Sequence, residues 1–228
     1  MPDIAARLAA VRARLAAAVE SAGRDPASVR LLAASKTRTP ADLRSALAAG
    51  QHLLGENRAQ ELRDKGNALE GEDIEWHFIG PLQKNKIKYV VGRARMIHSI
   101  DSLALAEAID ARIAQQKLPP IEALIQVNIG DESSKSGVPA AEALALVQAV
   151  DALPGLSVRG LMTIPPPVEN PTDAAPYFDA MVALAAAGRA AGLPLDELSM
   201  GMSHDLEVAV AHGATIVRVG TAIFGPRR

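Results

Sequence analysis

The sequence predicts an α/β protein, a single (β/α)8 barrel of the TIM type preceded by an extra N-terminal helix. Short apolar runs, about eight in number, alternate with helical stretches along the chain. They recur about every 20 to 30 residues, and no Gly-x-Gly-x-x-Gly turn follows the first run. An open doubly wound sheet would show the same alternation, but the number of runs, their spacing and the missing glycine motif favour the closed barrel.

The first element is an amphipathic N-terminal helix whose apolar residues recur at helical spacing. These residues are Ile4, Leu8, Val11, Leu15 and Val19. Charged residues interrupt the alanine-rich stretch, which is not the pattern of a secretory signal peptide. No stretch is long and uncharged enough to span a bilayer, so we expect no membrane partner and a cytoplasmic location.

The strands are expected where short runs of apolar and β-branched residues are bounded by Gly, Pro or polar residues. In chain order they are residues 30–34, 52–54, 75–79, 96–100, 123–129, 158–164, 197–200 and 216–219. The helices lie between them, at residues 41–49, 58–69, 85–91, 103–117, 140–152, 175–191 and 205–211. Thr39-Pro40, Asp101-Ser102 and Ser203 are typical helix-start signals, while the segment 85–91 is short for a barrel helix.

Length and composition narrow the function classes. At 228 residues the chain fits one α/β barrel, which reaches about 200 to 250 residues, so residues 1–228 are expected to form a single domain. The net charge of -2, without long like-charge runs, argues against nucleic acid as a partner and favours a small molecule. The absence of cysteine excludes thiol nucleophiles and cysteine metal sites, and we expect no metal.

Lys36 follows the first expected strand, and in such barrels the chemistry lies at the C-terminal ends of the strands. A partly desolvated lysine there can be a neutral amine that attacks a carbonyl to form a Schiff base. Alternatively it is a solvated strand-end lysine, or a partner for Glu56. Other polar residues at strand ends are Glu56 and Asn57 after the second strand and His77 after the third.

The last two strands end in segments that favour a bound anion. "SMGMS" leads into a helix expected near Ser203, and "VGT" supplies Gly220 and the hydroxyl of Thr221. Phosphate groups often bind between the loops after strands 7 and 8 of such barrels. The alternative is that Ser203 only caps a helix and the glycines only turn the chain.

Arg218 lies inside the apolar strand "TIVRVG", on the same face as Ile216 and Gly220. An arginine that points into the barrel needs an acceptor. A cofactor's ring nitrogen across the barrel mouth is one candidate, and a carboxylate such as Glu56 is another.

Several of these segments together are similar to a known family. "AASKTRTP", "GENRAQEL", "WHFIGPLQKNK", "NIGDESSKSG", "RGLMTIPPP" and "LSMGMSHDLEVAVAHGATIVRVGTAIFG" resemble the pyridoxal phosphate homeostasis protein family, which in turn resembles the N-terminal barrel domain of alanine racemase. The resemblance covers almost the whole chain, from the first strand onward.

The resemblance implies a set of residues that bind pyridoxal 5′-phosphate. Lys36 matches the lysine that forms the internal aldimine, and Ser203 matches the phosphate-binding serine, with Met202 contributing backbone. Gly220 and Thr221 match the Gly-Thr pair after the last strand. Arg218 matches the arginine that faces the pyridine nitrogen in the family. Asn57 and His77 lie in motifs that the family has near the cofactor.

The resemblance also implies a protein that carries the cofactor and delivers it to apo pyridoxal phosphate enzymes. An arginine beside the ring nitrogen of the cofactor cannot accept a proton from that nitrogen. The nitrogen therefore stays unprotonated, and the cofactor is a weaker electron sink. Racemisation needs a base on each face of the cofactor. Tyr89 and Tyr177, the two tyrosines of the sequence, lie in predicted helical regions, so neither is an obvious second base. We therefore assign no catalytic residue. The alternatives are an amino-acid racemase or related enzyme, a Schiff-base aldolase acting on a sugar phosphate, and a protein-interaction module.

Overall fold

The computed structural model describes residues 3–131 and 136–226. Residues 132–135 of the "NIGDESSKSG" motif, including Lys135, lie outside the described residues.

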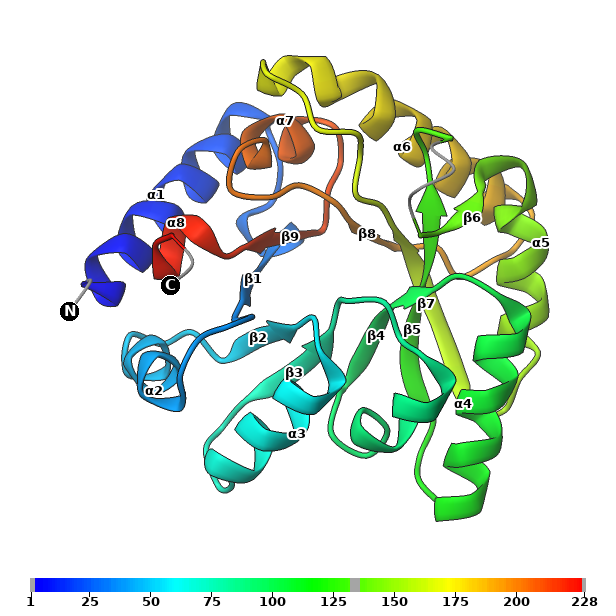
Figure 1. The fold of residues 1–228 in the computed structure, drawn as a ribbon. Coiled ribbons are helices and arrows are strands. Elements are labelled where there is room, and N and C mark those ends of the chain that lie inside the picture. Colours follow the sequence, from blue (N-terminus) through cyan, green and yellow to red (C-terminus); the bar gives the residue numbers. More distant parts are fainter. Residues whose placement is uncertain (1–2, 132–135, 227–228) are drawn as a thin grey trace.

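Eight parallel strands close into a barrel (Figure 1). They are β1 (Arg30–Ala34), β2 (Leu53–Glu56), β3 (Glu75–Phe78), β4 (Met96–Ile100), β5 (Ile121–Asn128), β7 (Leu156–Met162), β8 (Glu197–Ser199) and β9 (Ile216–Val219). The ring closes because β9 pairs with β1 and β4 pairs with β5. The two-residue strand β6 (Val138–Pro139) pairs with β5 beside the ring. The predicted (β/α)8 barrel is confirmed.

Helices surround the barrel on the outside (Figure 1). The α-helices are α1 (Ile4–Ser21), α2 (Pro40–Ala48), α3 (Ala59–Ala68), α4 (Leu103–Gln116), α5 (Ala140–Asp151), α6 (Ala175–Ala190), α7 (Leu206–Ala211) and α8 (Thr221–Phe224). The 3-10 helices are η1 (Pro26–Ser28), η2 (Lys84–Tyr89) and η3 (Pro171–Ala174). Among the described residues, no helix is both long enough and apolar enough to cross a membrane.

The N-terminal helix α1 is part of the helical ring. The helix after the last strand, α8, has only four residues, and α1 packs against α7, α8 and α2. Figure 1 shows α1 and α8 side by side. The apolar face predicted for this helix is buried, and the helix occupies the place that a longer final helix would fill.

Side chains fill the barrel interior, so the barrel is a packed core and has no pore. An apolar layer inside the strands consists of Leu32, Leu53, Ile79, Met96, Leu124, Met162 and Ile216. A larger apolar cluster fills the space between the strands and the helices. Successive strand residues therefore alternate between the two cores, which gives the near-continuous burial typical of a parallel sheet.

Four local expectations differ from the structure. Strand β2 extends to Glu56, which was expected in the following loop, whereas β7 ends at Met162. The helix expected at residues 85–91 is instead the 3-10 helix η2, which ends at Tyr89. The helix expected near Ser203 begins at Leu206 and has Asp205 at its N-cap position.

Candidate functional site

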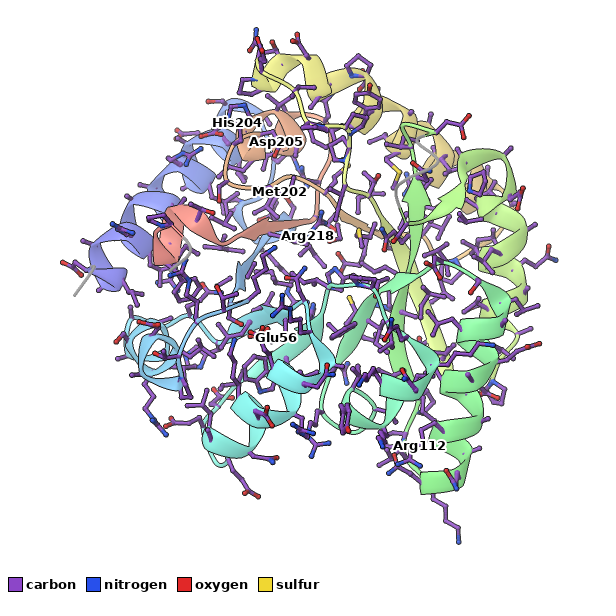
Figure 2. The ribbon with its side chains drawn as sticks, in the orientation of Figure 1. Glu56, Arg112, Met202, His204, Asp205 and Arg218 are labelled. Carbon is purple, nitrogen blue, oxygen red and sulfur yellow. The ribbon has the colours of Figure 1, made fainter. Side chains whose placement is uncertain are left out.

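A cavity of about 410 Å³ opens at the C-terminal ends of β1, β2, β8 and β9. It contains seven of the eight residues that the sequence singled out. These are Lys36, Asn57, Met202, Ser203, Arg218, Gly220 and Thr221. Figure 2 shows Met202 and Arg218 on the segments that follow β8 and form β9. A larger cavity, of about 830 Å³, lies at the opposite mouth, where the strands begin.

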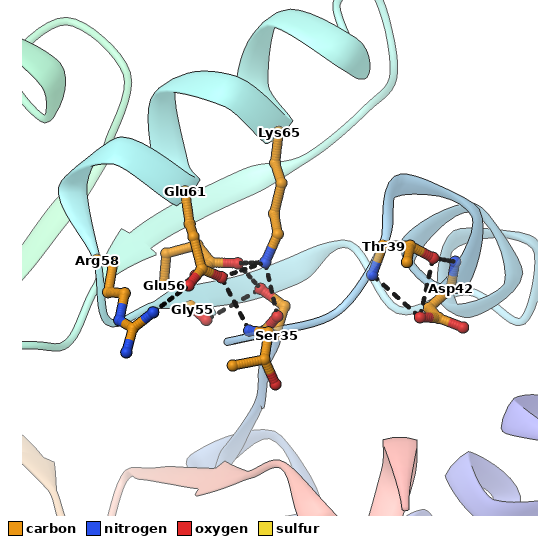
Figure 3. A network of polar contacts seen from close by, with 9 residues as sticks. Ser35, Thr39, Asp42, Gly55, Glu56, Arg58, Glu61 and Lys65 are labelled. Carbon is orange, nitrogen blue, oxygen red and sulfur yellow. Dashed lines mark hydrogen bonds and ion pairs between the residues drawn. The ribbon is translucent and has the colours of Figure 1, made fainter. Parts of the chain in front are cut away.

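The backbone on both sides of Lys36 is held by helix α3 and the end of β2 (Figure 3). The hydroxyl of Ser35 donates to Oε1 of Glu56 over 2.6 Å, and its carbonyl accepts from Nζ of Lys65 over 2.8 Å. The N–H of Thr37 donates to Oε2 of Glu61 over 2.8 Å. Thr37 also has a left-handed φ of 64°. These contacts direct the half-buried Lys36 into the cavity.

Lys65 is buried and already engaged. Its Nζ lies 2.5 Å from Oε1 of Glu56 and 2.9 Å from Oε2 of Glu61. Burial raises the pKa of Glu56, and the adjacent Lys65 opposes this rise. Glu56 points outward to α3, so the carboxylate suggested for Arg218 is part of a different cluster (Figures 2 and 3).

The loop after β8 brings Ser203 next to the last helix. Gly201 has a left-handed φ of 89°, and a Cβ at this position would lie 2.5 Å from Cβ of Ala209, so the turn requires glycine. Oγ of Ser203 accepts from the N–H of Ala222 over 3.4 Å. Gly220 lies close to β1, where a Cβ would be 3.1 Å from the carbonyl oxygen of Ala34. Ser203, Gly220 and Thr221 thus line the cavity together.

Met202 lines this cavity, but its backbone N–H is engaged. It donates to Oδ1 of the buried Asp205 over 2.6 Å. The same carboxylate stands at the N-cap position of α7, so Asp205 has the position expected for Ser203. The backbone donor that we expected Met202 to offer a ligand is therefore already used within the loop.

Arg218 points into the barrel mouth from β9 and is 5% exposed. Its Nη1 donates to Oγ of Ser199 over 2.7 Å, and its Nη2 donates to the carbonyl of Thr163 over 2.8 Å. Burial lowers the pKa of Arg218 to about 10, against a smaller opposing effect of Asp205. At neutral pH the guanidinium is therefore still charged, and it can only donate hydrogen bonds.

A family model described as the alanine racemase N-terminal domain matches residues 6–228. A pyridoxal phosphate homeostasis protein of Escherichia coli K12 is 46% identical, over 100% of this chain and 98% of its own. One from Aquifex aeolicus is 45% identical, over 97% of each chain. The chain belongs to the pyridoxal phosphate homeostasis protein family. PipY of Synechococcus elongatus PCC7942, solved with pyridoxal phosphate bound, is 38% identical with a TM-score of 0.82, covering 97% of this chain and 100% of that one.

His77, which the family resemblance places near the cofactor, is not among the residues that line the cavity. It is fully buried inside the barrel, and its ring contacts His98 and Glu75. Sequence reasoning also missed residues that do line the cavity, such as Arg38 and His204. Arg38 stands two residues after Lys36 in the family motif "SKTR", a position that could have indicated it. His98 and Ser199 carry no sequence signal beyond being polar residues in strands.

The described residues fit the cofactor that the family implies. A charged guanidinium, a strand-end lysine and two hydroxyls converge on a cavity that is otherwise lined by residues such as Ile79 and Ile164. Gly220 packs closely against β1, where any larger residue would press on Ala34. This donor set suits a planar aromatic molecule that carries a carbonyl group and a phosphate.

Proposed function

We propose that this chain binds pyridoxal 5′-phosphate in the cavity at the C-terminal mouth of the barrel, and that it holds and delivers the cofactor as part of its homeostasis. The observation that carries the proposal is the convergence of Lys36, Arg218 and the Ser203 loop on one cavity of about 410 Å³. The family membership supports the same role.

Each residue has a task that follows from its chemistry. Lys36 would hold the cofactor through Nζ, because an amine at the cavity can condense with an aldehyde. Ser203, Gly220 and Thr221 surround the phosphate with hydroxyl and backbone donors. Bound cofactor would supply an electron sink for amino-acid carbanions. Arg218 limits this property, since a guanidinium donates a hydrogen bond to the ring nitrogen and leaves it unprotonated.

Delivery to apo enzymes and a cytoplasmic location belong to this proposal, as does the view that residues 1–228 form one cofactor-binding domain. The names of the relatives support a role in pyridoxal phosphate homeostasis, and the family model, which matches residues 6–228, supports the single domain.

The rival function is an amino-acid racemase or related enzyme, which needs a base on each face of the cofactor. Lys36 provides one. Neither Tyr89, at the end of η2, nor Tyr177, in α6, lines the cavity. The two functions differ in α-proton exchange of alanine in deuterated water, followed by NMR. We expect none at a useful rate, and rapid exchange with inversion would favour the racemase.

The direct test is a visible absorption spectrum of the protein with pyridoxal 5′-phosphate, before and after borohydride reduction, followed by peptide mapping. We expect a Schiff-base band and a reduced adduct on Lys36. Lys36→Ala should lose the band while circular dichroism shows an intact fold, because a residue at the mouth contributes little core area. An adduct on Lys65 or Lys135, or a protein that forms no band, would refute the proposal. A colourless protein that cleaves sugar phosphates would favour an aldolase.

A further inference from the structure

A row of polar side chains crosses the interior of the barrel from one mouth to the other. It starts at Arg218, beside the cavity, and passes through Ser199 on β8, His98 on β4 and His77 on β3. The last three are at most 1% exposed. At the other mouth it ends at Glu75 and Arg30, which line the larger cavity.

Adjacent members of the row are within hydrogen-bonding distance. Oγ of Ser199 lies 2.7 Å from Nη1 of Arg218 and 2.9 Å from Nδ1 of His98. Nε2 of His98 lies 2.8 Å from Nδ1 of His77. Nε2 of His77 lies 2.9 Å from Oε1 of Glu75, which also accepts from Nη2 of Arg30 over 2.6 Å.

The two ends determine the direction of every bond between them. Arginine can only donate, and an ionised carboxylate can only accept. The hydrogen bond from His77 is the main cause that lowers the pKa of Glu75, to about 2, so this carboxylate is ionised at neutral pH. Nε2 of His77 therefore carries the proton that faces Glu75, and Nδ1 of a neutral His77 accepts from the Nε2–H of His98. Nδ1 of His98 in turn accepts from the hydroxyl of Ser199, whose oxygen accepts from Arg218.

The opposite direction would be unfavourable. If Nδ1 of His98 carried the proton, a neutral His77 would turn a lone pair toward the carboxylate of Glu75. A charged His77 would avoid this, but burial disfavours it and lowers the pKa of His77 against the effect of Glu75. Only one arrangement satisfies all four contacts with both rings neutral.

We propose that Ser199, His98 and His77 are positioning residues that hold Arg218 through one continuous, one-directional chain of hydrogen bonds, anchored at the far mouth by Glu75. The chain fixes which N–H groups of Arg218 remain for the cavity, because its contacts with Ser199 and Thr163 use one N–H of each terminal nitrogen. Its effect on cofactor binding rests on the proposed function, but the chain itself belongs to the protein without ligand.

The first measurement is a long-range ¹H–¹⁵N spectrum of the imidazoles in the full chain without ligand at neutral pH. We expect both rings to be neutral and protonated on Nε2. A proton on Nδ1 of either ring, or a charged ring, would overturn the proposal, whether or not the protein binds the cofactor.

The second measurement uses Glu75→Gln, which weakens the acceptor at the far end without changing a residue that lines the proposed cofactor cavity. Asp73→Asn is the matched control, because Asp73 lines the same mouth and its Oδ2 lies 3.3 Å from Nδ1 of His52, outside the chain. We expect Glu75→Gln to shift the side-chain signals of His98 and Arg218 and to weaken pyridoxal 5′-phosphate binding by about 2- to 30-fold. The control should do neither.

Three results separate the two proposals. If Glu75→Gln leaves the signals of His98 and Arg218 unchanged, the chain is not continuous and this inference fails. If the signals move but the affinity does not, the positioning role fails. If the wild-type protein binds no cofactor, the proposed function fails, and the spectra still decide whether the chain exists.

Discussion

Lys36 and Lys65 both lie near the end of β1, yet their surroundings give them different roles. Nζ of Lys65 is within 3 Å of two carboxylates and a carbonyl, and 7% of its side chain is exposed. The donors of this amine are already used by its three acceptors, so it is not available to a ligand in the cavity. Lys36 instead lines the cavity. Location at a strand end identified Lys36 from the sequence, whereas the engagement of Lys65 depends on how α3 packs.

Ser203 is expected to contribute to phosphate binding. Ser203→Ala removes a hydroxyl from the phosphate end of the cavity. It should weaken binding of pyridoxal 5′-phosphate by about 1.5 to 3 kcal/mol, the usual contribution of a hydrogen bond to a charged group. Binding of pyridoxal, which has no phosphate, should change little. Titration by absorbance measures both affinities.

The control is Ser45→Ala, which removes an exposed hydroxyl on α2 that donates to the carbonyl of Ala41. It should leave both affinities unchanged. An equal loss for pyridoxal and its phosphate in Ser203→Ala would contradict the assignment of Ser203 to the phosphate.

The end of strand β2 and helix α3 form a clamp around the segment that carries Lys36. Ser35 and Thr37 are bound by three residues of β2 and α3, and the following helix α2 starts with a capping box between Thr39 and Asp42 (Figure 3). The Thr39-Pro40 start signal predicted this helix correctly. The clamp was not predictable, since it depends on the buried pairing of Glu56 with Lys65 across two elements.

The buried pair of Glu56 and Lys65 in this clamp is expected to stabilise the folded protein. Lys65→Ala leaves the fully buried carboxylate of Glu56 without its cation, and removing one partner of a buried ion pair typically costs about 3 to 5 kcal/mol. Urea unfolding should show this loss. Arg44→Ala, which breaks the exposed pair with Glu72 at 3.4 Å, should cost below about 1 kcal/mol. A loss in Lys65→Ala no larger than in this control would show that the pair contributes little to the fold.

At the scale of the whole molecule, closure of the barrel places β9 beside β1 and encloses a polar chain within an apolar layer. Burial lowers the pKa of His77, and it lowers the pKa of His98 well below its ordinary value. The charged and titratable groups that act on the two rings are Glu75, Glu122, Arg30, Arg218 and the rings themselves. Both histidines are thus expected to stay neutral in the folded protein.

This predicts that the folded state loses stability as the pH falls. Unfolded histidines take up protons near a pKa of about 6.5, where the buried ones do not, so the unfolded chain binds more protons below that pH. The free energy of unfolding should fall from pH 7 to pH 5, by up to about 1.4 kcal/mol per pH unit for each histidine. Urea unfolding at several pH values measures it.

His98→Gln should reduce this pH dependence, because one of the two rings is gone. Glu75 does not add to it in this window: its lowered pKa of about 2 gives stability that is lost only at more acidic pH. A free energy of unfolding that is constant from pH 7 to pH 5 would contradict the neutrality of the two rings.

The sequence by itself determined the order of strands and helices and most of the cavity. Strand and helix periods are local properties, and the C-terminal ends of parallel strands meet at one mouth, so Lys36, Ser203, Gly220 and Thr221 could be grouped without coordinates. Only the tertiary structure decided that α1 completes the helical ring, that the N–H of Met202 is taken by Asp205, and that His77 contacts His98 inside the barrel. His98 and Ser199 are 101 residues apart in the chain. Such contacts depend on barrel closure, strand register and the direction of each side chain, and local periodicity does not encode how distant strands meet.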